Sequence, residues 1–141
     1  MSGVAQRTIS KPCHPRFLNE VRAMLAEMLR DVAVPKREKD LIILAVDEAV
    51  SSIVRYARWK GVESQVTLTV DIDDVRFKAV LVDSANVFDL GYGLTEAQLA
   101  ERVAREKTHT MGVFLMRQIL DEITYVYKKG FQNELELIKF L

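Results

Sequence analysis

Two acidic residues, Glu48 and Asp83, occupy positions where the sequence pattern predicts at least partial removal from solvent. Glu48 lies in a helical pattern one turn before Ser52, so the two side chains are neighbours on one face. A partly covered carboxylate needs a partner, because otherwise its pKa rises. Glu48 is therefore a candidate general base or metal-linked carboxylate. The structural alternative is a glutamate that bonds a neighbouring loop or Arg55.

Asp83 follows the alternation of a strand. It is in phase with Val75, Phe77, Ala79 and Leu81, which predicts that it points to the core at the end of that strand. A carboxylate that points inward must be hydrogen-bonded. It would either cap the loop that follows or bind the donor groups of a ligand, such as the amino group of adenine.

A third candidate is the start of an apolar helix at Thr110-Met111-Gly112. Threonine is a good N-cap, and a helix N-terminus with a glycine holds anions well. Arg105 and Lys107 come just before it and would face either phosphate or solvent. Cys13 and His14 do not make a metal site on their own, because a stable zinc site needs about four ligands.

The helix that carries Glu48 is predicted to run from Pro35 to about Trp59, and its residues separate into three stripes. The predicted core stripe consists of Ile43, Val46, Val50, Ile53 and Ala57. The predicted solvent stripe consists of Asp40, Asp47, Ser51 and Arg58. A third, largely apolar stripe opposite the core consists of Leu41, Ala45, Glu48, Ser52 and Tyr56. Two apolar faces indicate a helix that is covered on both sides.

The other elements follow from periodicity and turn residues. The first half is expected to contain a strand at Val4–Ile9, a helix at Pro15–Val32, the helix just described, and strands at Val66–Ile72 and Val75–Asp83 joined by an Asp73-Asp74 turn. An irregular stretch at Ser84–Leu94 and helices at Thr95–Glu106 and Met111–Leu120 are expected to follow. The last expected element is a hairpin of Ile123–Tyr127 and Glu134–Phe140. This order predicts a single α/β domain over residues 1–141: a two-layer α+β sandwich with helices on one face of a mixed, mostly antiparallel sheet.

The composition restricts the class of protein. A net charge of zero over 141 residues argues against direct nucleic-acid binding, and one cysteine excludes an internal disulfide. No apolar run reaches the roughly 20 residues of a membrane span, and the first residues lack the apolar core of a signal peptide. We therefore expect a cytoplasmic protein that does not enter a membrane.

Three segments resemble the GHKL ATPases in order and spacing. Leu44–Ser52 is similar to their N-box helix, Val82–Asp89 to the strand and loop of their first glycine box, and Gly112–Glu122 to the helix after their second glycine box. The last segment and the closing hairpin most resemble the RsbW-type anti-sigma-factor serine kinases. The resemblance covers Lys11–Leu141 and implies one domain of the Bergerat (GHKL) type.

The resemblance implies roles for individual residues. Glu48 matches the catalytic base, Asp83 matches the aspartate that reads adenine, and Ser52 stands where an asparagine binds Mg²⁺. The implied ATP-contacting residues are Ser52, Asp83, Ala85, Val87, Thr108, Thr110, Gly112 and Val113. Several positions depart from the family pattern: Ser52 replaces asparagine, Ala85 a glycine and Tyr56 a common histidine, while His109 and Thr110 lie in a lid that is usually rich in glycine.

The function implied by the resemblance is that of an anti-sigma factor with serine/threonine kinase activity. Such a protein acts in transcription regulation as a homodimer, binds ATP and Mg²⁺, holds a sigma factor, and phosphorylates an anti-sigma-factor antagonist, which is a STAS-domain protein. The alternative is a catalytically inactive module of the same fold that regulates its partners by binding alone. Ser52, Ala85 and His109 favour this alternative, while Glu48 and Asp83 favour the kinase.

Overall fold

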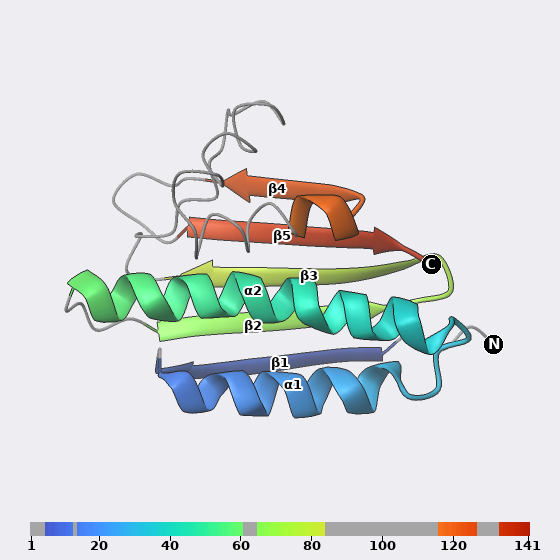
Figure 1. Cartoon of the computed structure of the whole chain (residues 1–141), viewed down its shortest axis with the longest axis horizontal. Helices are drawn as coiled ribbons and strands as arrows, with labels where there is room; N and C mark the ends of the chain where they lie inside the picture. The colour runs from blue at the N-terminus through green and yellow to red at the C-terminus, as the bar shows by residue number, and fades with distance from the viewer. Residues whose placement is uncertain (1–4, 13, 61–64, 84–115, 127–132) are drawn as a thin grey trace.

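A computed structural model describes residues 5–12, 14–60, 65–83, 116–126 and 133–141 (Figure 1). The elements are β1 (Ala5–Pro12), α1 (Pro15–Leu29), α2 (Lys36–Lys60), β2 (Gln65–Ile72), β3 (Arg76–Asp83), β4 (Glu122–Val126) and β5 (Asn133–Phe140). The strands form one sheet, and α1 and α2 lie side by side on one of its faces (Figure 1). Two bounds differ from expectation, since β1 continues to Pro12 and α1 ends at Leu29.

The sheet has the order β1-β2-β3-β5-β4, and all four of these pairings are antiparallel. The predicted fold class is confirmed, and so is the closing hairpin of β4 and β5. β2 and β3 bury alternate residues, as their sequences predict. The buried side chains of these two strands are Val66, Leu68, Val70, Ile72, Phe77, Ala79, Leu81 and Asp83. Two layers therefore share one core between the helices and this face of the sheet.

The turn between β2 and β3 is held by Asp73. Its Oδ1 accepts hydrogen bonds from the backbone N–H groups of Val75 at 2.8 Å and Arg76 at 2.9 Å. These bonds lower the pKa of Asp73. Val75 thereby belongs to the turn, where it is 64% exposed, so its predicted place on the core face of the strand was wrong. The residue occurs just before the strand begins, and alternation alone does not mark that boundary.

One side chain caps the start of α1, and another joins α1 to the neighbouring strand. The His14 side chain caps the helix by accepting from the N–H of Arg16 at 3.1 Å. Arg7 on β1 forms a two-pronged ion pair with Glu27, at 3.0 and 2.9 Å, and this bond lowers the pKa of the Glu27 carboxyl. The Arg7–Glu27 pair thus joins α1 to the edge strand β1.

Parts of the predicted architecture lie outside the described residues. These are the helix at Thr95–Glu106, the irregular stretch at Ser84–Leu94 and the start of the helix at Met111–Leu120. Residues 116–119 of that last helix are helical, and Met116 is fully buried in the core. Within the described ranges, no helix has both the length and the apolar character that crossing a membrane requires.

Candidate functional site

The helix α2 buries its predicted core stripe and, in addition, part of the face that was expected opposite it. Its buried residues are Ile42, Ala45, Val46, Ala49, Val50, Ser52, Ile53 and Val54. Ala45 and Ser52 belong to the stripe that was expected opposite the core, while Ile43 is only partly buried. Val46, Val50 and Ile53 are buried as predicted, but the helical period alone does not tell how far a buried arc extends around the helix. The stripes of Val46 and Ser52 merge into one broad buried arc.

Ser52 lies at the side of this arc with no exposed surface. Its hydroxyl donates a hydrogen bond to the backbone carbonyl of Glu48, one turn earlier, at 2.9 Å. Such a bond from a serine to the preceding turn satisfies the hydroxyl proton inside the helix itself. Ser52 is thus already engaged with the backbone of the residue expected to be the catalytic base.

Glu48 is half-buried at the border of the same arc. An ion pair beside Glu48 joins α2 to the neighbouring helix α1. The Arg22 guanidinium contacts the two carboxylate oxygens of Asp47 at 2.6 and 3.1 Å. The Asp47 side chain is only 16% exposed, so its predicted place on the solvent stripe was wrong. Sequence reasoning missed this pair, because it joins two helices.

Asp83 points to the core, as the strand alternation predicted, and is 2% exposed. It is the last residue of β3 and lies between Val66 of β2 and Asn133 of β5 in the sheet register. In Figure 1, α2 and β3 run in the same direction, so Asp83 lies at the end of the sheet toward which the C-terminal half of α2 points. Glu48, Ser52 and Asp83 therefore belong to the same layer of the fold, the one between the sheet and α2.

The remaining predicted site residues lie outside the described residues. They are Ala85, Val87, Thr108, Thr110, Gly112 and Val113, together with Arg105, Lys107 and His109. The side chains of residues 55–60, which include Arg55 and Tyr56, are likewise outside the description. Among the side chains that the structure does place, no three His, Cys, Asp or Glu gather as a metal site.

Ser52 and Asp83 are the two buried polar side chains of the described part of the site, and they differ in the hydrogen-bonding groups they offer. Asp83 has almost no exposed surface, and a buried carboxylate is satisfied by hydrogen-bond donors, of which an amino group is one kind. Mg²⁺, in contrast, is bound through accessible oxygens and keeps several waters. Ser52 offers no accessible surface, and its proton is directed to the Glu48 carbonyl. In this arrangement the Ser52 hydroxyl is poorly placed to bind Mg²⁺.

A comparison with protein families matches most of this chain. The family model described as histidine kinase-like ATPase domain matches residues 12–139. The sequence has no match among the curated proteins.

Two similar solved structures share the fold at low sequence identity. One contains the RsbU and RsbW domains of Rv1364c from Mycobacterium tuberculosis, with a TM-score of 0.66, 14% identity, and coverage of 96% of this chain and 32% of that chain. This chain thus spans about a third of that protein. The other is the SiaB–SiaC complex from Pseudomonas aeruginosa, with a TM-score of 0.68, 14% identity, and coverage of 96% and 88% of the two chains.

Proposed function

Because the chain belongs to the family of histidine kinase-like ATPase domains, we propose that it is an anti-sigma-type regulator that binds ATP and phosphorylates a serine of a partner protein. The partner in this proposal is an anti-sigma-factor antagonist of the STAS type, and the regulated protein is a sigma factor. The fold likeness to a structure that contains an RsbW domain supports this class of regulator. In this proposal the protein acts as a cytoplasmic homodimer.

The observation that carries the proposal is the burial of Asp83. An acidic side chain at 2% exposure is costly unless donors satisfy it. Its place at the end of β3, over the layer that α2 covers, suits the amino group of an adenine that enters from that end of the sheet. Asp83 would then select adenine over a base that presents a carbonyl at the same position, because two acceptors facing each other lose the hydrogen bond.

Glu48 supplies the acid–base chemistry in the proposed reaction. Its carboxylate takes the proton from the serine hydroxyl of the partner while that oxygen forms a bond to the γ-phosphorus of ATP. The bond from the γ-phosphorus to the β,γ-bridging oxygen breaks, and ADP leaves with the electron pair. The Arg22–Asp47 ion pair next to Glu48 would help to hold this part of α2 in place during the reaction.

The experiment that tests nucleotide binding is calorimetric titration with ATP and with ADP, each with and without magnesium. Asp83→Asn should weaken ATP binding by about 1–3 kcal/mol, or roughly 5- to 150-fold, because it spoils a buried charge-assisted hydrogen bond. Asp71→Asn is the matched control: Asp71 lies on β2 and pairs with Gln6 at 2.6 Å. Equal ATP affinity in wild type and Asp83→Asn would refute the adenine role.

A phosphotransfer assay with the antagonist of the same organism tests catalysis. Glu48→Ala should abolish phosphorylation and leave ATP affinity nearly unchanged, because the base acts on the acceptor. Glu38→Ala, in the first turn of the same helix, should retain activity. Undiminished phosphorylation by Glu48→Ala would rule out this residue as the base.

A second candidate function is favoured by Ser52. Its full burial and its bond to the Glu48 carbonyl leave the expected metal-ligand position without accessible oxygen. A protein with this feature would hold its partner without phosphorylating it, with or without bound nucleotide. Tight binding of the antagonist with no phosphate transfer from wild type, in the presence of ATP and magnesium, would decide for this binding module.

A further inference from the structure

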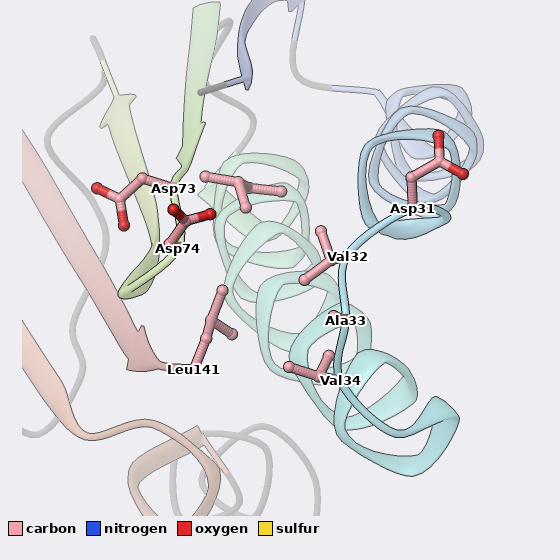
Figure 2. A pocket seen from close by; sticks show the side chains of 8 residues that line it. Asp31, Val32, Ala33, Val34, Asp73, Asp74 and Leu141 are labelled. Atoms are coloured by element: carbon pink, nitrogen blue, oxygen red, sulfur yellow. The ribbon is translucent and has the colours of Figure 1, made fainter. Parts of the chain in front are cut away.

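A pocket of about 400 Å³ lies at the end of the sheet opposite Asp83 (Figure 2). Its wall comes from three segments that are distant in sequence: residues 31–34 between α1 and α2, residues 72–74 at the end of β2, and Leu141. Its size falls in the range of about 300–1,000 Å³ that is usual for ligand pockets. It shares no residue with the candidate nucleotide site.

Apolar side chains form part of the pocket wall. Val32 and Val34 approach from one side and Leu141 from the other, and the half-buried side chains face each other across the opening (Figure 2). The wall is held in place, since the N–H of Leu141 donates to the Val75 carbonyl at 2.8 Å. Val75 and Phe140 lie beside this contact and are 64% and 48% exposed. Strand alternation places Phe140 with its partner Arg76 on the face of the sheet away from the helices, so Val75 is the exposed apolar residue beside the pocket.

The charge around the pocket is of one sign. Asp31, Asp73 and Asp74 line it, and none of the lining residues is basic. Asp73 is committed to the turn through its two backbone hydrogen bonds. Asp31 and Asp74 are exposed, and within the described ranges neither forms an ion pair. Two carboxylates thus remain available for a cation from outside.

We propose that this pocket docks a basic, amphipathic segment of a partner protein. An arginine or lysine suits it, because such a side chain lays an apolar stem on apolar surface and keeps its charged head at the rim. The stem would lie on Val32, Val34 and Leu141, and the head would reach Asp31 and Asp74. An apolar residue flanking the cation would cover Val75. This surface is remote from the nucleotide site, so the inference does not depend on kinase activity or ATP binding.

The test uses the full chain without nucleotide, labelled at its Ile, Leu and Val methyl groups for NMR. The probe is a blocked five-residue peptide that alternates leucine and arginine. It should shift the methyl signals of Val32, Val34, Ile72 and Leu141 in a saturable manner. The same peptide with glutamine in place of arginine should bind at least about fivefold more weakly, because it loses the charge pairs while keeping the apolar contacts.

Variants of the protein give the complementary test. The double variant Asp31→Asn/Asp74→Asn should weaken binding of the arginine peptide about fivefold or more, since each partly exposed pair contributes a few-fold. Asp40→Asn, which removes an exposed carboxylate paired with Lys36 outside the pocket, is the matched control and should bind as wild type does. Shifts scattered over other methyl groups, or equal affinity in the double variant and wild type, would overturn the proposal. Equal binding of the glutamine peptide would also overturn it and indicate a purely apolar occupant.

Discussion

Replacing Ser52 by residues of different size tests the packing around the candidate site. Ser52→Ala removes one buried hydroxyl and its 2.9 Å bond to the Glu48 carbonyl. A hydrogen bond of this kind contributes about 0.5–1.5 kcal/mol. Alanine recovers up to about 0.7 kcal/mol through its better helix propensity. We therefore expect Ser52→Ala to lower the free energy of unfolding by no more than about 1 kcal/mol.

Ser52→Asn should cost considerably more. The asparagine side chain is larger, and Ser52 has no exposed surface into which it could extend. Ala49 and Ile53 on the same arc are 0% and 1% exposed, so the surroundings are filled. Overpacking costs about 1–3 kcal/mol. Amide groups left without partners add about 1–3 kcal/mol. The expected loss is therefore about 2–5 kcal/mol.

Urea unfolding followed by circular dichroism, without any ligand, measures both changes. Ser51→Asn is the matched control, because Ser51 is only half-buried and its replacement should stay within about 0.5 kcal/mol of wild type. If Ser52→Asn were as stable as Ser52→Ala, the argument from packing would be refuted. Space would then exist for a metal-binding amide at this position, and the second candidate function would lose its main support.

Three further predictions concern the scaffold. Leu25→Ala should lower the free energy of unfolding by about 2–5 kcal/mol in urea, because Leu25 is fully buried; a loss below about 1 kcal/mol would contradict this packing. Arg7 lowers the pKa of Glu27 in the folded state. The ion pair therefore adds to the free energy of unfolding at any pH above the pKa that Glu27 has in the unfolded chain, and this addition is lost as the pH falls through the lower pKa of Glu27 in the folded protein. Thermal unfolding at pH 7 and pH 3 should therefore show a smaller acid-induced loss in Glu27→Gln than in wild type; equal losses would exclude this linkage. Asp73→Ala should speed hydrogen exchange of the two turn N–H groups that its carboxylate binds, and unchanged rates would show that the turn does not depend on it.

The strands were predictable from sequence because their period is two. Once Leu68 and Phe77 are placed in the core, the direction of every second residue follows, and this parity placed Asp83 inward. Where β3 begins was not predictable in the same way. The Asp73 carboxylate takes up two N–H groups that would otherwise extend the strand, and Val75 turns outward as a result.

The width of the buried arc of α2 could not be read from the sequence, although Val46, Val50 and Ile53 lie in the core as predicted. A helix with apolar residues on more than one stripe can be covered on one of them or on several, depending on what packs against it. Here Ala45 of the opposite stripe is buried as well. Whether Ser52 points to solvent, ligand or core is therefore a tertiary property. The pocket beside Asp31 was equally hidden, since distant segments build it.

The position of β1 in the sheet has a consequence for how the protein is made. β1 is the first of the strands that the structure describes, yet its only neighbour among them is β2. The hydroxyls of Thr8 and Thr69 meet at 3.1 Å across 61 residues, and those of Ser10 and Thr67 at 2.9 Å across 57. During synthesis from the N-terminus, β1 leaves the ribosome well before its partner. The backbone N–H and C=O groups of β1 therefore stay bonded to water, and the strand stays unpaired, until α1, α2 and β2 have emerged.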